Sequence, residues 1–344
     1  MLDDLKFIHE KDQQDALGIA EKQWHQLEHI FPLDWQPKEH ITNVVLAGMG
    51  GSALAGLLST TWPDYHVPFE IVRDYEAPSY ISPSTLFIAS SYSGNTEETL
   101  SALEQAEAAQ AQIIVIASGG KLQEIATAKN FPFEQLPLAS QPRFGVLYGL
   151  KALVTILERA GLVKTAEAEK SLHIAAETLK KAIQDWLPTI PTKDNPAKRL
   201  ALELMGKSVI VYAGPKLFPA AYKWKISFNE NAKNLAWCNQ LPEFNHNEFL
   251  GWTSHPVNKP YAVIDLRSKL EHPRVQKRFA VTERLLSGKR PAPHIVEVQG
   301  ETILEQLLWS IALGDFVSLY LALLNGLNPT PVDLIEKFKT SLDN

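Results

Sequence analysis

The chain contains 344 residues, of which 45% are apolar and 21% charged, and its formal net charge is −6. This composition is typical of a globular protein with about two domains. Acidic and basic residues are interspersed, so the sequence does not indicate a nucleic-acid partner. The most apolar stretch, 303–327, is interrupted by Glu305 and Asp315, and we expect no membrane-spanning helix.

Cys238 is the single cysteine. An intrachain disulfide and a cysteine-based zinc site are therefore excluded, and we interpret Cys238 as a small buried hydrophobic residue. The first residues, MLDDLK, are polar and acidic, unlike a signal peptide. We expect a cytoplasmic protein.

Residues 2–30 carry apolar side chains at helical spacing, which predicts helices. From residue 43 onwards, short apolar runs alternate with helical stretches, a pattern typical of a parallel sheet covered on both faces. The expected strands are 43–47, 69–72, 86–89 and 113–117. The expected helices are 52–58, 96–109, 121–129 and two helices within 143–185.

The proline-rich segment 186–196 predicts a linker, after which the alternation resumes. Strands are expected at 208–214, 261–265 and 294–298, and helices at 218–232, 302–325 and 332–341. The sequence thus predicts an α/β protein with two three-layer α/β/α subdomains, each built on a mainly parallel sheet flanked by helices. The expected boundaries are an N-terminal helical segment 1–40, a first domain 41–186 and a second domain 197–344.

The turn 48–52 (GMGGS) joins an expected strand to an expected helix. Its glycines allow backbone N–H groups to approach an anion, and the helix N-terminus favours negative charge. The spacing matches neither the dinucleotide fingerprint nor a Walker A loop. Glycines at such turns are also commonly structural, so this turn alone leaves both interpretations open.

The segment 90–99 (SSYSGNTEET) also joins a strand to a helix, and its hydroxyl groups can donate to several phosphate oxygens. Thr96 could equally serve only as a helix N-cap. Ligands of open parallel sheets bind beyond the carboxyl ends of the strands, so the two turns can converge on one site. Neither turn contains lysine, which favours capture of a phosphate monoester by hydroxyl and backbone groups.

Five segments occur in order: 48–52 (GMGGS), 91–96 (SYSGNT), 142–143 (PR), 228–233 (FNENAK) and 241–247 (LPEFNHN). Together they resemble the bifunctional phosphoglucose/phosphomannose isomerase family of archaea and bacteria, which belongs to the sugar isomerase (SIS) domain superfamily. The resemblance runs from about residue 40 to the C-terminus. It implies two SIS-type domains, a homodimer and isomerisation of sugar 6-phosphates without a metal or redox cofactor.

The resemblance also implies roles for individual residues. Binding of the substrate phosphate is implied for Gly50, Gly51, Ser52, Ser91, Ser93 and Thr96. Glu230 would move a proton between C1 and C2, and Arg143 would stabilise the enediolate. His246, supplied by the neighbouring subunit, would help to open the sugar ring, and Lys339 would assist at the ring oxygen.

These residue types suit the chemistry, because isomerisation needs a carboxylate base, a donor for the developing charge and a group for ring opening. Simpler interpretations exist for each residue. Glu230 lies in a polar helix end and could be solvated, and Arg143 and Lys339 could lie at the surface. His246 could join a metal cluster with His255, although the spacing fits no standard zinc site.

Two other functions stay open at this point, a sugar-phosphate-binding regulatory protein of SIS type and another sugar-phosphate isomerase.

The sequence also leaves open which residue lines the substrate pocket beside C2 of the sugar. In the family, a small threonine precedes the closing helix. Val332 stands at the equivalent spacing from Lys339, whereas Thr330 lies two residues earlier. Either residue could line the pocket for C2 of the sugar.

Overall fold

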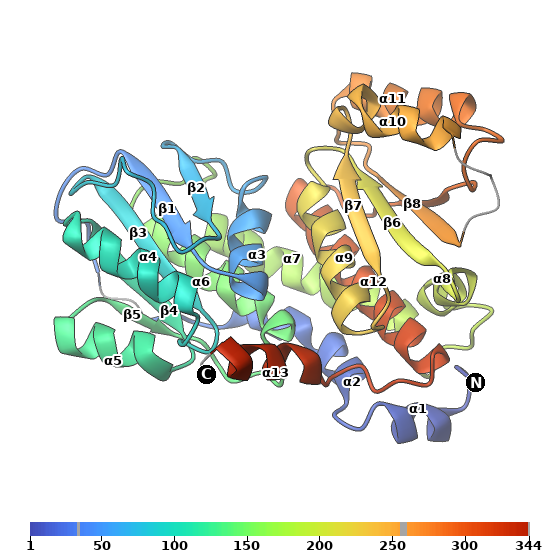
Figure 1. Ribbon diagram of the computed structural model, residues 1–344, viewed down its shortest axis with the longest axis horizontal. Coiled ribbons are helices and arrows are strands. Elements are labelled where there is room, and N and C mark those ends of the chain that lie inside the picture. Colours follow the sequence, from blue (N-terminus) through green and yellow to red (C-terminus); the bar gives the residue numbers. More distant parts are fainter. Residues whose placement is uncertain (33–34, 255–259, 343–344) are drawn as a thin grey trace. The chain divides into compact units, whose positions relative to one another are not determined.

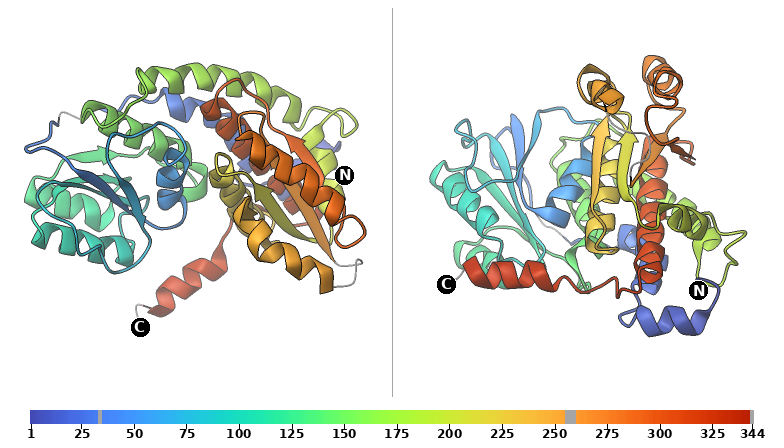
Figure 2. Two further views of the ribbon diagram at one scale, coloured as in Figure 1. Left: turned by 90° about the horizontal axis from the view of Figure 1, so that it is seen from above. Right: turned by 45° about the vertical axis from the view of Figure 1, so that its right-hand side comes forward.

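A computed structural model describes residues 1–32, 35–254 and 260–342. The chain forms two compact units (Figures 1 and 2). One unit is Lys22–Thr178, and the other combines Met1–Glu21 with Leu179–Asn344. The helices expected within residues 2–30 are therefore divided between the two units.

The unit Lys22–Thr178 is built on a five-stranded sheet with the order β2-β1-β3-β4-β5, in which every neighbouring pair is parallel. Its strands are β1 (Asn43–Ala47), β2 (Phe69–Val72), β3 (Thr85–Ser91), β4 (Gln112–Ala117) and β5 (Phe133–Gln135). Its helices are η1 (Gln23–Glu28), α3 (Gly50–Ser59), α4 (Glu97–Ala108), α5 (Gly120–Lys129), η2 (Pro142–Phe144), α6 (Val146–Arg159) and the first part of α7 (Ala168–Ile183). The four expected strands are confirmed, and β5 is an additional short one.

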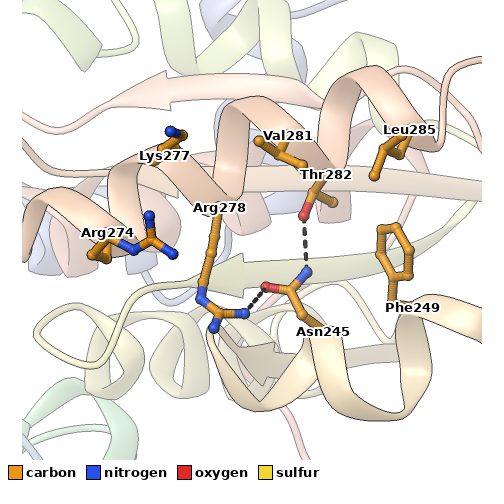
Figure 3. A pocket seen from close by; sticks show the side chains of 8 residues that line it. All are labelled: Asn245, Phe249, Arg274, Lys277, Arg278, Val281, Thr282 and Leu285. Atoms are coloured by element: carbon orange, nitrogen blue, oxygen red, sulfur yellow. Dashed lines mark hydrogen bonds between the residues drawn. The ribbon is translucent and has the colours of Figure 1, made fainter.

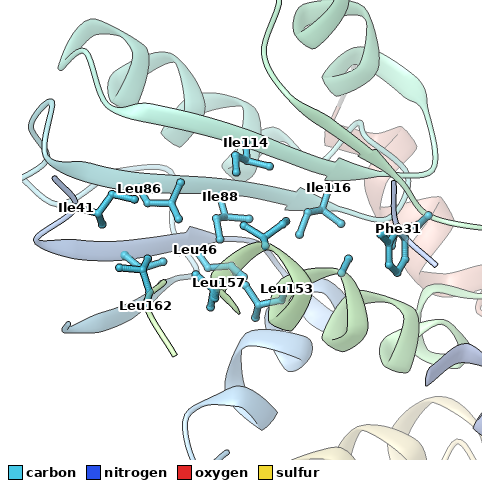
Figure 4. Close-up of a cluster of buried hydrophobic side chains, with 14 residues drawn as sticks. Phe31, Ile41, Leu46, Leu86, Ile88, Ile114, Ile116, Leu153, Leu157 and Leu162 are labelled. Carbon is cyan, nitrogen blue, oxygen red and sulfur yellow. The ribbon is translucent and has the colours of Figure 1, made fainter. Parts of the chain in front are cut away.

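Alternate residues of these strands pack on opposite faces of the sheet. On one face, Leu46 and Ile88 contact a cluster that includes Leu153 and Leu157 of α6 (Figure 4). On the other face, residues such as Val45 pack against side chains of α4 and α5. Burial on both faces explains why these strands are nearly continuous apolar runs in the sequence.

The second unit holds a four-stranded parallel sheet with the order β7-β6-β8-β9. Its strands are β6 (Ser208–Ala213), β7 (Ala236–Gln240), β8 (Tyr261–Arg267) and β9 (His294–Glu297). Its helices are α1 (Leu5–Lys11), α2 (Ala16–Glu21), η3 (Gln184–Trp186), α8 (Pro196–Leu204), α9 (Phe218–Glu230), η4 (Glu243–His246), α10 (Glu248–Gly251), η5 (Trp252–Ser254), α11 (Pro273–Leu285), α12 (Ile303–Leu324) and α13 (Asp333–Leu342). The predicted α/β class with two parallel sheets is confirmed.

The long helix α12 begins at a capping box, in which the Thr302 hydroxyl and the Glu305 carboxylate bond to each other's backbone N–H groups. By length and composition alone this helix could cross a membrane, but 94% of its most apolar window is buried inside the protein. It contacts α8 and α9. We therefore assign α12 as the central core helix of its unit.

Candidate active site

Strand β1 ends at Ala47, which is paired with Ala89 of β3, and β3 continues for two more residues to Ser91. Gly48, the first residue after β1, lies directly against the end of β3, where the segment 90–99 begins. A Cβ atom at Gly48 would come within 2.7 Å of the Ser90 carbonyl oxygen. The two turns that the sequence singled out are therefore in backbone contact.

Helix α3 starts at Gly50, within the segment 48–52, and its N-cap residue Met49 makes no side-chain cap hydrogen bond. Gly50 has a φ of +50°, a conformation that glycine adopts without the strain of a side chain. The Ser52 hydroxyl accepts a hydrogen bond of 2.9 Å from the Tyr92 N–H group. This bond fixes the start of α3 to the turn after β3.

In the second turn the hydroxyl groups are organised around Ser91. Its Oγ lies 2.7 Å from Thr96 Oγ1 and accepts a 3.2 Å hydrogen bond from the Gly94 N–H group. Ser93 Oγ accepts a 3.2 Å bond from the Asn95 N–H group. Thr96 stands at the N-cap position of α4, yet its hydroxyl makes no cap bond. Simple capping therefore does not explain Thr96.

A third predicted segment joins these turns. A Cβ atom at Gly51 would lie 3.0 Å from the Pro142 carbonyl oxygen, so the backbone of η2 runs beside the start of α3. Arg143 is 2% exposed, and its guanidinium lies 4.6 Å from the centre of the Phe144 ring. It is buried rather than at the surface. Gln26, which no sequence pattern singles out, donates a 2.6 Å hydrogen bond from its side chain to the Phe144 carbonyl oxygen.

The structure thus brings together the residues expected to bind phosphate, at the carboxyl end of one sheet. They are Gly50, Gly51, Ser52, Ser91, Ser93 and Thr96. Two hydroxyl-bearing turns and the N-termini of α3 and α4 meet here, an arrangement that suits a bound anion. A phosphate monoester matches its hydroxyl and N–H donors.

Glu230, His246 and Lys339 belong to the other unit. Glu230 is the half-buried last residue of α9. Lys233 follows with a φ of +49°. Its ammonium group donates hydrogen bonds of 2.9 Å to the carbonyl oxygens of both Asn328 and Pro329. The segment that contains Glu230 is therefore tied to the loop that leads into α13, the helix that carries Lys339.

His246 is exposed and ends η4. Its neighbour Asn245 bridges two residues of α11, since it accepts a 3.2 Å bond from Arg278 and donates a 2.9 Å bond to Thr282 (Figure 3). These residues border a pocket of about 310 Å³ that contains none of the predicted catalytic side chains. The pocket is lined by Asn245, Phe249, Arg274, Lys277, Arg278, Val281, Thr282 and Leu285.

Lys339 is exposed on α13 and lies 2.9 Å from a carboxylate oxygen of Glu336. His255, which the sequence offered as a partner of His246 in a metal cluster, lies outside the described residues. In the described ranges, no group of three or more histidine, cysteine or acidic residues is placed to hold a metal ion. Burial raises the pKa of the Cys238 thiol to about 11, which makes this side chain a poor nucleophile at neutral pH.

Comparison with known proteins supports the resemblance read from the motifs. A family model described as the bacterial phospho-glucose isomerase C-terminal SIS domain matches residues 193–342. A glucose-6-phosphate isomerase-like protein from Thermus thermophilus shares the fold, with a TM-score of 0.67, 19% identity and 98% of each chain covered.

Two curated relatives differ in their named activity. A D-glucosamine-6-phosphate 4-epimerase of Sulfolobus acidocaldarius is 35% identical over 65% of this chain and 68% of its own length. A bifunctional phosphoglucose/phosphomannose isomerase of Caldicellulosiruptor bescii is 36% identical over 88% of this chain and 90% of its own length. With this identity over nearly the whole length, the chain belongs to the bifunctional phosphoglucose/phosphomannose isomerase family.

Proposed function

We propose that this protein interconverts glucose 6-phosphate and mannose 6-phosphate with fructose 6-phosphate through a cis-enediol intermediate. The observation that carries the proposal is the convergence of the glycine-rich turn 48–52, the hydroxyl-rich segment 90–99 and Pro142–Arg143, in a chain that belongs to this isomerase family. The proposal assigns no metal or redox cofactor to the reaction. We also propose that residues 41–186 and 197–344 form the two SIS domains.

The phosphate group of the substrate binds at the turns after β1 and β3. Ser52, Ser91, Ser93 and Thr96 supply hydroxyl groups, and Gly50 and Gly51 allow close approach of the backbone. Anchoring the phosphate fixes the far end of the opened sugar, so C1 and C2 come to the catalytic groups in one orientation. The turns therefore bind and orient the sugar but take no part in proton transfer.

Ser52→Ala is expected to raise KM for both aldose phosphates about 10- to 100-fold, because hydrogen bonds to charged groups contribute roughly 1.5–3 kcal/mol. The substitution also removes the acceptor of the Tyr92 N–H bond. Steady-state kinetics with each aldose phosphate measures the change. Ser59→Ala, at the other end of α3, is the control, and an unchanged KM in Ser52→Ala would exclude this role.

In the proposed reaction Glu230 removes the proton from C2 of the opened aldose. The C1 carbonyl becomes the enediolate oxygen, whose charge Arg143 stabilises. Glu230 then returns the proton to C1, and the C2 hydroxyl becomes the ketone as its proton moves to O1. His246 and Lys339 serve the preceding ring opening, as proton donor and acceptor at the ring oxygen and the C1 hydroxyl.

The two aldoses differ in the position of the hydrogen at C2, so acting on both requires space beside that carbon. The candidates for this wall remain Thr330, which is buried, and Val332, which is half-buried. Both lie in the segment between α12 and α13, next to the carbonyl groups that Lys233 holds. Either residue would therefore lie beside the segment that contains Glu230.

We further propose that the protein is a cytoplasmic homodimer in which each active site receives His246 from the partner subunit. The exposure of His246 in the single chain fits this role. A mixed dimer of the Glu230→Gln and His246→Ala variants tests it. One of its two sites would combine intact Glu230 and His246 from different chains, so mixing is expected to restore activity. Continued inactivity of the mixed dimer would contradict the shared site.

A coupled assay of fructose 6-phosphate formed from each aldose phosphate tests the function as a whole. We expect product from both sugars, unchanged by a chelator, whereas loss of activity on chelation would support the metal alternative. The epimerase among the relatives makes C4 epimerisation of a hexosamine 6-phosphate a second candidate. Turnover of glucosamine 6-phosphate without any aldose–ketose conversion would favour it. Binding of sugar phosphates without turnover would favour a regulatory protein.

A further inference from the structure

We propose that a buried polar seam between α9 and α12 positions Glu230, an inference that rests on the proposed role of that residue. The two helices are in contact within one unit and lie side by side (Figure 1). The polar seam consists of Lys223, Ser227 and Asn231 on the α9 side and Asp315 and Ser318 on α12. Each of these residues is 5% exposed or less.

An ion pair forms the middle of the seam. The Lys223 ammonium group donates a 2.7 Å hydrogen bond to Ser227 Oγ and a second hydrogen bond to Asp315 Oδ1. Ser227 Oγ in turn donates a 2.7 Å bond to the same carboxylate oxygen. Because Lys223 and Ser227 lie one turn apart on α9, both bonds fix the rotation of this helix about its axis.

A second connection lies directly beside the catalytic carboxylate. Asn231, the residue after Glu230, donates a 2.9 Å hydrogen bond from Nδ2 to Ser318 Oγ. Ser318 Oγ donates a 2.9 Å bond to the Asp315 carbonyl oxygen, so its lone pairs face the Asn231 amide. The end of α9 is thereby held one residue away from Glu230.

Close backbone packing completes the alignment of the helices. The Trp224 indole N–H group donates a 2.7 Å bond to the Ser310 carbonyl oxygen. A Cβ atom at Gly314 would come within 2.5 Å of the same indole nitrogen. A translation or rotation of α9 would therefore break these hydrogen bonds or force the Trp224 indole against Gly314. Glu230 would move with the helix.

The seam is better explained by positioning than by stability. Replacing a buried ion pair with apolar side chains of similar volume is often neutral or stabilising. A polar network in an otherwise apolar core instead specifies one arrangement of the elements that it joins. In this protein the seam would fix the position of the Glu230 carboxylate. Small displacements of a reacting group have large effects on the reaction rate.

Ser318→Ala tests the inference with the smallest change. We expect kcat to fall about 10- to 100-fold with KM changed less than about threefold, as for a reacting group displaced by roughly 1 Å. Ser318→Thr keeps the hydroxyl and should retain most of kcat. Ser310→Ala is the matched control, because the buried Ser310 hydroxyl has no hydrogen-bond partner among the described residues. Equal kcat values in the two alanine variants would overturn the inference.

The triple variant Lys223→Met/Ser227→Ala/Asp315→Leu separates positioning from folding, because it removes the ion pair together with the buried hydroxyl that both partners bond. We expect its urea midpoint to stay at or above that of the wild type while kcat falls. A lower midpoint with unchanged kcat would show that the seam serves stability alone. Glu230→Gln distinguishes this failure from failure of the proposed function. If Glu230→Gln is inactive but Ser318→Ala is fully active, only the positioning role is lost.

Discussion

Glu230→Gln is expected to lower kcat for conversion of glucose 6-phosphate to fructose 6-phosphate by about 10²–10⁴-fold, the usual contribution of a general base. The amide keeps the shape of the side chain but cannot accept the C2 proton. Glu230 lies at the end of α9 and does not belong to the phosphate-binding turns. Binding of fructose 6-phosphate, measured by calorimetry, should therefore stay within a few-fold of the wild type.

A matched control separates this effect from a change in charge. Glu301→Gln makes the same substitution at an exposed position of the same unit, and its kcat should equal that of the wild type. Full activity in Glu230→Gln would rule out Glu230 as the base. Loss of both binding and turnover would show instead that the substitution disturbs the site as a whole.

Gly94→Ala is expected to destabilise the phosphate-binding turn and the unit that contains it. Gly94 has a φ of +71°, and an added Cβ atom would lie 1.8 Å from the Gly119 carbonyl oxygen. The left-handed conformation and the backbone clash together should lower the free energy of unfolding by about 2–5 kcal/mol. Urea unfolding measures the loss, and KM for sugar phosphates should rise because the Ser91–Thr96 hydroxyl pair is displaced.

Gly161→Ala is the control that introduces the backbone strain without the steric clash. Gly161 lies in the same unit with a φ of +70°, and nothing lies within 4 Å of the position of an added Cβ atom. This control should lose only about 1–2 kcal/mol, the contribution of the left-handed conformation, and keep its KM. Equal losses in the two variants would mean that the contact between the turn and Gly119 is not tight.

Much of the fold was predictable because buried parallel strands are continuous apolar runs. Strands β1, β3, β4, β6 and β8 are all of this kind and were recognised. Strand β7 was missed, because Ala236–Gln240 (AWCNQ) mixes polar and apolar residues at an edge of its sheet, where Trp237 is 44% exposed. β5 was missed because it has only three residues.

The residues of the candidate site could be predicted from the sequence, but the contacts between their side chains could not. Sequence could not decide between capping and ligand binding for Thr96, because both use the same hydroxyl at the same position. Only the structure shows that this hydroxyl pairs with Ser91. In the same way, Asp315 could be read only as an interruption of an apolar stretch, since its partner Lys223 lies 92 residues away.

Turnover in D₂O shows whether Glu230 carries a proton between C1 and C2 of the sugar. Because Glu230 is half-buried rather than sealed from solvent, its proton should exchange with the medium in a fraction of turnovers. We expect fructose 6-phosphate formed from glucose 6-phosphate by the wild-type protein to carry deuterium at C1, detected by NMR. Fructose 6-phosphate that forms without any deuterium at C1, or no product at all, would contradict it.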